Sequence, residues 1–195
     1  MKLLYLDDNI DTVLEKYLVN FCDERSISYS HWDFENEKTS FIDLIMSDQI
    51  RNSNILIIDS FLFESRNGGE NRFMGEELYL ILKKIYPFIE VIVISNKSVD
   101  TELGDIIIKR KYLRGRKHTD ELGIKHYDEN LKIHLDCAIE SIEAWLHIKD
   151  KISKSSTFDT VLVDKLNSSF NGNTDYDNLQ KSDIDELIKV LKGVL

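Results

Sequence analysis

Two apolar runs decide the fold of this chain: MKLLYLDDN at residues 1–9 and ILIID at residues 55–59. Each is rich in aliphatic residues and ends on carboxylates, Asp7 and Asp8 in the first run and Asp59 in the second. Short runs without polar alternation are typical of strands buried on both faces of a parallel sheet. Because parallel strands place their carboxyl ends at one edge, where open α/β sheets bind ligands, the three acids are predicted to converge there.

The predicted acidic cluster indicates a cation site. Carboxylates a few ångströms apart disfavour each other's ionised form unless a positive charge compensates them. A hard divalent cation with oxygen ligands, Mg²⁺, suits this role, with Asp7, Asp8 and Asp59 as ligands. A competing interpretation is that the acids cap helices, Asp8 or Asn9 being suited to cap the helix that follows.

Outward from these two runs, strand and helix patterns alternate along the chain. Pro87, the only proline, ends the third predicted helix. Five repeats of strand and helix predict an α/β fold: a five-stranded parallel sheet in the order 2-1-3-4-5, with helices on both faces. The predicted strands are residues 2–6, 26–32, 55–58, 91–94 and 124–127, and the predicted helices are residues 9–24, 41–50, 75–86, 101–113 and 131–152.

The character of the sequence changes after residue 152. We therefore divide the chain into an α/β domain, residues 1–152, and a helical C-terminal extension, residues 153–195. The extension contains an amphipathic stretch at residues 158–170 and a last helix that Ser182 caps. Two short helices with one apolar face each must pack on the domain, on each other or on a partner.

Over residues 1–152 the chain resembles the receiver domain of two-component response regulators, a flavodoxin-like fold. Five features occur in the family's order along the chain. They are the acidic pair Asp7 and Asp8, then Asp59, the Gly-Glu-Glu-Leu opening of a helix at residues 75–78, Ser95 after the fourth strand, and Tyr127 in the predicted fifth strand.

The resemblance implies a phosphoryl-accepting site. Asp7 and Asp8 would hold Mg²⁺ together with Asp59 and the backbone carbonyl of Phe61, and Asp59 would be the phosphoacceptor. The chemistry agrees with this assignment, because an aspartyl phosphate stays reactive and Mg²⁺ neutralises charge on the transferring group.

The resemblance also implies a switch. Ser95 would hydrogen-bond a phosphoryl oxygen and couple phosphorylation to a shift of a loop and a helix, and Tyr127 would follow that shift. Each residue has a simpler interpretation: a serine after a strand is often part of a turn, and a buried tyrosine is often part of the core.

The sequence departs from the family at two places. Receiver domains end the fifth strand with lysine and proline, and the lysine pairs with the phosphoryl group. Here the predicted fifth strand leads to Asn130, or to Glu129 after a one-residue shift, so the lysine is predicted to be missing, with Lys97 as a substitute from a neighbouring loop. The loop at residues 60–74 is also longer than usual and is a candidate lid or docking surface.

Composition excludes several other functions. A net charge of −10 over 195 residues opposes a phosphate backbone, so nucleic acid is not an expected partner. No apolar run reaches the roughly 18 residues of a membrane span, and no signal-peptide core precedes Asp7, which predicts a cytoplasmic protein without a membrane partner. Cys22 and Cys137 lack metal-ligand spacing and are predicted to be reduced packing residues.

The sequence leaves three functions open. The first is an atypical response-regulator receiver in a phosphorelay, which takes a phosphoryl group from a histidine kinase or a small phosphodonor and then changes its contacts with a downstream protein. The second is an unphosphorylated pseudo-receiver that acts as a protein-binding module, and the third is a Mg²⁺-dependent phosphatase. Apart from self-phosphorylation no enzyme activity is expected, and homodimer formation is left open.

Overall fold

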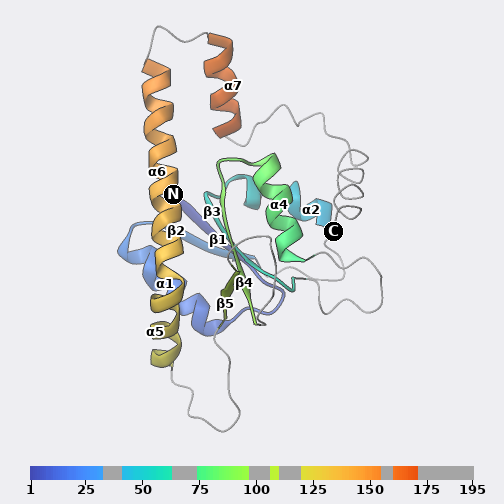
Figure 1. The fold of residues 1–195 in the computed structure, drawn as a ribbon, viewed down its shortest axis with the longest axis vertical. Coiled ribbons are helices and arrows are strands. Elements are labelled where there is room, and N and C mark those ends of the chain that lie inside the picture. The colour runs from blue at the N-terminus through green and yellow to red at the C-terminus, as the bar shows by residue number, and fades with distance from the viewer. Residues whose placement is uncertain (33–40, 63–73, 97–105, 110–119, 155–159, 171–195) are drawn as a thin grey trace.

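The computed structural model describes residues 1–32, 41–62, 74–96, 106–109, 120–154 and 160–170. Figure 1 shows strands flanked by helices in this part of the chain. The strands are β1 Lys2–Leu6, β2 Ser28–Trp32, β3 Ile55–Asp59, β4 Glu90–Ser95 and β5 Ile106–Ile108. The helices are α1 Thr12–Glu24, α2 Phe41–Ile45, α3 Asp48–Arg51, α4 Gly75–Ile85, α5 Asp120–Asn130, α6 Lys132–Lys154 and α7 Thr160–Phe170.

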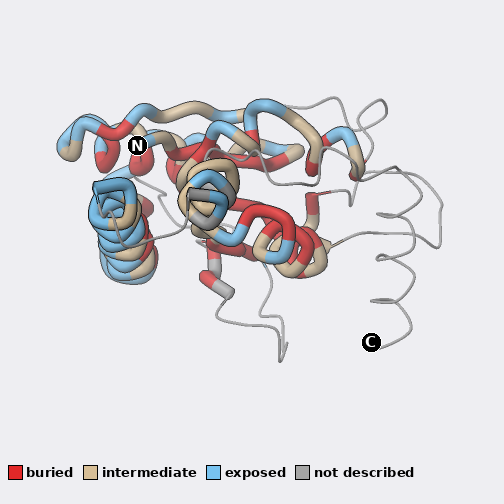
Figure 2. The backbone as a smooth tube through the Cα atoms, turned by 90° about the horizontal axis from the view of Figure 1, so that it is seen from above, coloured by how far each residue is buried: buried red, intermediate tan, exposed pale blue. Residues whose placement is uncertain are grey.

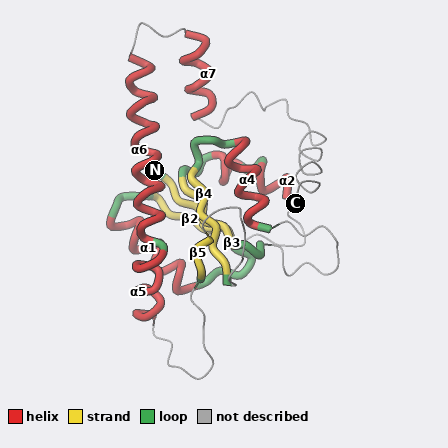
Figure 3. Tube along the Cα trace, viewed as in Figure 1, coloured by secondary structure: helices red, strands yellow, loops and turns green. Residues whose placement is uncertain are grey.

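The predicted α/β class and the order of the first four strands are confirmed. The sheet runs β2-β1-β3-β4, all neighbours are parallel, and the short strand β5 pairs with the outer side of β4. Strand β3 is buried along its whole length, as its uninterrupted apolar run predicts. Figure 3 shows these strands side by side at the centre of the molecule.

The prediction for the fifth strand is wrong. Residues 124–127 lie in helix α5, and residues 106–108, which the sequence assigned to a helix, form β5. Three consecutive isoleucines are a short β-branched run that suits an edge of the sheet. The segment at 124–127 is helical because Gly123, Tyr127 and Leu131 recur at four-residue spacing and are all buried.

Helices cover both faces of the sheet, and Figure 2 shows buried stretches of the chain at the centre with exposed stretches around them. Leu3 and Tyr5 of β1 belong to a cluster of apolar side chains with α1, α5 and α6. The alternating residues Leu4 and Leu6 pack with α2 and α4 in a second cluster. Successive side chains of a strand point to opposite faces, so the central strands need an apolar cover on both.

The C-terminal extension is described only in part. Helix α6 runs to Lys154 without a break at the predicted boundary of residue 152, and α7 falls within the predicted amphipathic stretch. The predicted helix capped by Ser182, the lid segment at residues 63–73 and Lys97 lie outside the described residues. The division into two parts therefore stays a prediction. Among the described helices, none combines the length and apolar character that crossing a membrane requires.

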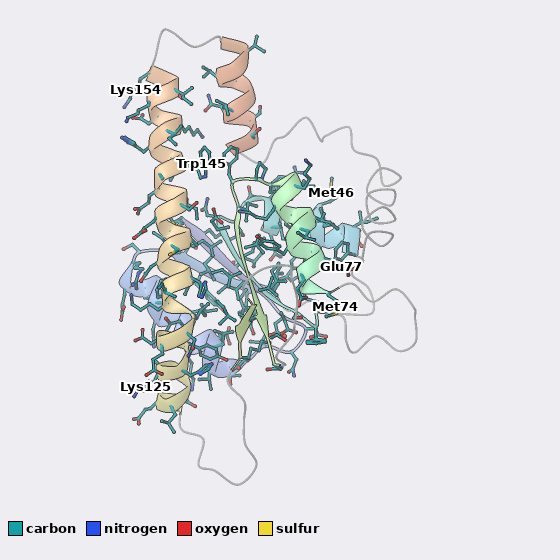
Figure 4. All side chains as sticks on the ribbon, viewed as in Figure 1. Met46, Met74, Glu77, Lys125, Trp145 and Lys154 are labelled. Atoms are coloured by element: carbon teal, nitrogen blue, oxygen red, sulfur yellow. The ribbon has the colours of Figure 1, made fainter. Side chains whose placement is uncertain are left out.

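Helix α4 begins in close contact with the end of β3. The backbone N–H of Gly75 donates a hydrogen bond to the Ser60 carbonyl at 2.9 Å. A Cβ atom at position 75 would lie 2.4 Å from the carbonyl oxygen of Asp59, too close for any side chain. The start of the helix is closed by Glu77, whose carboxylate accepts from the Met74 N–H at 2.8 Å (Figure 4). Glycine at this position therefore lets the helix approach the strand end.

We expect Gly75→Ala to destabilise the fold by about 1–3 kcal/mol, because the added methyl meets backbone atoms that cannot move aside. Helix propensity alone predicts the opposite sign, since alanine is favoured over glycine by about 1 kcal/mol. Urea unfolding measures the difference. Lys84→Ala, at an exposed position of the same helix, is the control and should change stability by no more than about 0.5 kcal/mol. A Gly75→Ala protein as stable as wild type would contradict the close contact.

Both cysteines were predicted to be packing residues, and this prediction is wrong for Cys137. Cys22 is buried and Cys137 is exposed. Burial raises the pKa of the Cys22 thiol to about 11, so the reactive thiolate is scarce at pH 8. We expect iodoacetamide at pH 8 to label Cys137 alone in the folded protein and both cysteines in denaturant. Intact mass after each treatment reads the result, and equal labelling of both thiols in the folded protein would contradict the burial of Cys22.

Candidate functional site

The three predicted acids converge at one edge of the sheet. Asp7 and Asp8 follow β1 directly, Asp59 is the last residue of β3, and the register pairs Leu6 with Ile58. One carboxylate oxygen from each acid lies within 4.8 Å of the others. Asp7 and Asp59 are buried and Asp8 is partly exposed. The predicted convergence of these residues is confirmed.

A lysine that sequence analysis missed completes the cluster. Lys109 follows β5, is only 3% exposed, and places its Nζ atom 2.5 Å from Asp7 Oδ2 and 2.8 Å from Asp59 Oδ1. Its backbone N–H donates to the Ser95 carbonyl at 2.7 Å, which continues the pairing of β5 with β4. The ammonium group therefore joins the ends of β1 and β3 from the edge of the sheet.

The prediction that Asn130 or Glu129 takes the place of a missing lysine is wrong. Asn130 ends α5 in an exposed position, and its amide donates to the His126 carbonyl at 2.7 Å. The predicted helix at residues 101–113 contains the pattern Ile-Ile-Ile-Lys at residues 106–109, which in the structure is a strand followed by the lysine. That pattern repeats the plan of β1 and β3, an apolar run that ends on a charged residue, and was the available signal.

Burial and charge act against each other in this cluster. Burial raises the pKa of the Asp59 carboxyl, and the Lys109 ammonium opposes the rise. For Lys109, burial favours the neutral amine, but attraction to Asp59 and Asp7 outweighs it and raises the pKa above 10.5. Lys109 is therefore charged at neutral pH. One ammonium cannot balance three carboxylates, so the cluster keeps an excess of negative charge.

The acids also suit a magnesium ion by their chemistry. All three offer hard oxygen donors, which Mg²⁺ prefers, at metal–oxygen distances of about 2.1 Å. One oxygen of each carboxylate already lies within 4.8 Å of the others, a spacing at which a single ion could contact all three acids. Lys109 already neutralises part of the negative charge of Asp7 and Asp59. The acids therefore need a metal ion less than the sequence suggested. The Mg²⁺ assignment stays a prediction.

The segment after Asp59 is held firmly. Phe61 donates its backbone N–H to Asp59 Oδ2 at 2.9 Å, and Ser60 donates its N–H to the Ile94 carbonyl at 2.7 Å. The buried Ser60 hydroxyl donates to Glu76 Oε1 at 2.7 Å, which ties the strand end to α4. These contacts orient the Asp59 carboxylate, while the ligand role predicted for the Phe61 carbonyl stays untested.

Of the two predicted switch residues, Ser95 lies at the end of the fourth strand as predicted, and Tyr127 lies elsewhere in the fold. Ser95 is fully buried at the end of β4, one residue after the Ile94 that pairs with Asp59. Tyr127 lies in α5, packs against Tyr17 with ring centroids 6.0 Å apart, and is not on a strand as predicted. Because β5 consists of isoleucines alone, the aromatic residue expected on the fifth strand is not there.

A separate cavity of about 470 Å³ lies at the opposite edge of the sheet. Its lining includes Asn54 and Ile89, which precede β3 and β4, together with Trp145 of α6. The acids follow the strands instead, so this cavity is not part of the acidic cluster.

We expect Lys109→Met to destabilise the protein by about 3–5 kcal/mol at neutral pH, because it leaves buried carboxylates without their cation. The deficit should shrink as the pH falls. Lys109 is the main influence that opposes the raised pKa of Asp59, so its removal should raise that pKa further. Between the pKa of Asp59 in the unfolded chain and its higher pKa in the folded protein, the folded state then holds a proton on Asp59 that the unfolded state has released. The stability of the variant therefore decreases as the pH rises through this range. Wild type should instead lose the Lys109 contribution only above pH 10.5, as pH rises through the raised pKa of Lys109.

Denaturant unfolding at several pH values measures both effects. Lys16→Met is the matched control, since Lys16 pairs with Asp120 at the surface with side chains 60% and 54% exposed, and it should cost less than about 1 kcal/mol. A Lys109 variant that behaves like the Lys16 variant would contradict the buried ion pair.

Comparison of the chain with protein-family models gave no match. Comparison with curated protein sequences gave no match either.

Proposed function

We propose that this chain is a receiver-like signalling protein in which Asp59 accepts a phosphoryl group. In this proposal Asp7, Asp8 and Asp59 hold Mg²⁺, and modification of Asp59 changes the contacts of the protein with a downstream partner. The observation that supports it best is the buried Lys109 ammonium, which contacts both Asp7 and Asp59 at the carboxyl ends of parallel strands. A lysine at the end of the fifth strand is the feature of receiver domains that the sequence was predicted to lack.

The arrangement suits phosphoryl transfer in several respects. An Asp59 carboxylate oxygen would attack the phosphorus of the donor, and the bond from phosphorus to the leaving oxygen would break, so that acetyl phosphate would yield acetate and an aspartyl phosphate. Lys109 would pair with an oxygen of the transferred group, and the Ser95 hydroxyl would donate a hydrogen bond. Bound Mg²⁺ would supply neutralisation of charge on that group.

The finer features of the fold follow from the same proposal. Strand β5 takes the fifth position in the order 2-1-3-4-5, which is compatible with a flavodoxin-like receiver. Arg110 follows Lys109 where the family has proline. The donor would be a histidine kinase or a small phosphodonor in the cytoplasm, and the partner would be a protein rather than nucleic acid, as the charge of −10 suggests.

The alternative is an unphosphorylated binding module with the same fold. Its main support was the missing lysine, and Lys109 removes that argument. One observation still favours it: Asp59 is 4% exposed and Lys109 is 3% exposed, so a phosphodonor has little direct access to the acceptor. The two functions differ in whether Asp59 becomes modified.

We expect acetyl phosphate with Mg²⁺ to add the mass of one phosphoryl group to the wild-type chain, measured by intact mass spectrometry. Asp59→Asn should stay unmodified, and Lys109→Gln should react roughly a hundredfold more slowly, as for loss of one charge-stabilising donor. Asp8→Ala should reduce the rate by weakening the metal site. Asp120→Asn, at an exposed acid of α5, is the matched control and should react like wild type.

The outcomes separate the functions. A wild-type chain that binds Mg²⁺ but never gains the phosphoryl mass would favour the binding module. Modification that survives in Asp59→Asn would place the acceptor elsewhere and contradict the proposal.

A further inference from the structure

Tyr5 adds a contact to the acidic cluster that the resemblance does not supply. It lies on β1 two residues before Asp7, its side chain is fully buried, and its hydroxyl donates to Asp7 Oδ2. The same oxygen accepts from Lys109 Nζ, while Asp7 Oδ1 accepts from the Asn9 N–H at 2.9 Å. Both oxygens of Asp7 are therefore oriented, one of them by Tyr5 and Lys109 together.

The Tyr5 hydroxyl also reaches the first helix. Its oxygen accepts from the backbone N–H of Asp11 at 3.4 Å. Asp11 is the N-cap of α1, where its Oδ1 accepts from the N–H groups of Val13 and Leu14 at 2.9 and 3.1 Å. The cap holds the helix start in place, since the first N–H groups of a helix have no partners within it.

The chain of hydrogen bonds ends in α5. Tyr127 is fully buried, and its hydroxyl donates to the second carboxylate oxygen of Asp11, Oδ2, at 2.9 Å. The hydrogen bonds thus run from the acidic cluster to helix α5 through Lys109, Asp7, Tyr5, Asp11 and Tyr127.

Other tyrosines that pack in this apolar cluster do not take part in such a series of hydrogen bonds. The hydroxyl groups of Tyr17 and Tyr29 are buried without a hydrogen-bond partner among the described residues. Replacing a tyrosine whose hydroxyl has no partner by phenylalanine removes no hydrogen bond. Replacing Tyr5 by phenylalanine removes one of the donors to the Asp7 carboxylate. Tyr29, on the strand next to β1, therefore offers a matched control.

We propose that Tyr5 is a positioning residue, which orients Asp7 for the cation and couples the state of the acidic cluster to the start of α1 and to α5 through Asp11 and Tyr127. A cation held by Asp7 would reduce the negative charge that this carboxylate presents to Tyr5 and Lys109, so the hydrogen bond from the Tyr5 hydroxyl would respond to it. The part that concerns Mg²⁺ rests on the proposed function, and the coupling itself exists without metal.

The first arm of the test needs no metal. Unfolding of Tyr5→Phe, Tyr127→Phe and the double variant forms a cycle in which only hydroxyl groups change. Both hydroxyls contact Asp11, so the loss of one should weaken the contribution of the other. The double variant should therefore be less destabilised than the sum of the two single variants, and its equilibrium constant for unfolding should be at least threefold smaller than independent effects would give. The same cycle with Tyr29→Phe in place of Tyr127→Phe should be additive. Additivity in both cycles would overturn the coupling.

The second arm measures Mg²⁺ affinity from thermal melts at increasing metal concentration. Tyr5→Phe should weaken binding by roughly threefold to tenfold, and Tyr29→Phe should bind as wild type does. In hydrogen exchange, Mg²⁺ should protect the amides of α5 in wild type, and this added protection should be lost in Tyr127→Phe although the metal still binds.

The arms keep this proposal distinct from the proposed function. Equal Mg²⁺ affinity of the Tyr5→Phe and Tyr29→Phe proteins would overturn the positioning role even if Asp59 is phosphorylated. A wild-type chain that binds no Mg²⁺ would contradict the metal site of the proposed function, and the metal-free cycle would then decide the coupling by itself.

Discussion

The contact of Lys109 with Asp7 and Asp59 is the interaction on which the rest of the site depends. Charges taken out of water are costly, and a buried carboxylate without a cation is destabilising by several kcal/mol. The ammonium of Lys109 allows β1 and β3 to end on buried acids side by side. The backbone of the same residue extends the edge strand, because its N–H continues the pairing of β5 with β4.

The elements around this ion pair leave little freedom to the acids. Asp59 is held through Phe61, and the following Ser60 is tied to Glu76 of α4, whose glycine start permits a close approach to the strand. Asp7 is oriented by Tyr5 on the other face. A site built on strand ends and supported by such contacts is rigid, which phosphoryl transfer and metal binding both require.

The two faces of the sheet contribute in different ways. The face with α4 anchors the end of β3, while the face with α1 and α5 carries the hydrogen bonds from Asp7 toward Tyr127. Under the proposed function, a change at Asp59 would need a physical link to the helices around the sheet. The hydroxyls of Tyr5 and Tyr127 would form part of such a link, on residues whose rings belong to the apolar core.

The sequence by itself predicted the α/β class, because strand and helix patterns alternate along it. The order of four strands and the meeting of Asp7, Asp8 and Asp59 then followed from a general rule of doubly wound parallel sheets, in which the carboxyl ends of the strands share one edge. The sequence did not determine the fifth strand. The run at residues 106–108 is too short for periodicity to separate strand from helix, and only pairing with β4 decided it. That pairing carried Lys109 into the cluster and left Asn130 at the surface, because partners that are distant along the chain are chosen by the packed sheet and not by neighbouring residues.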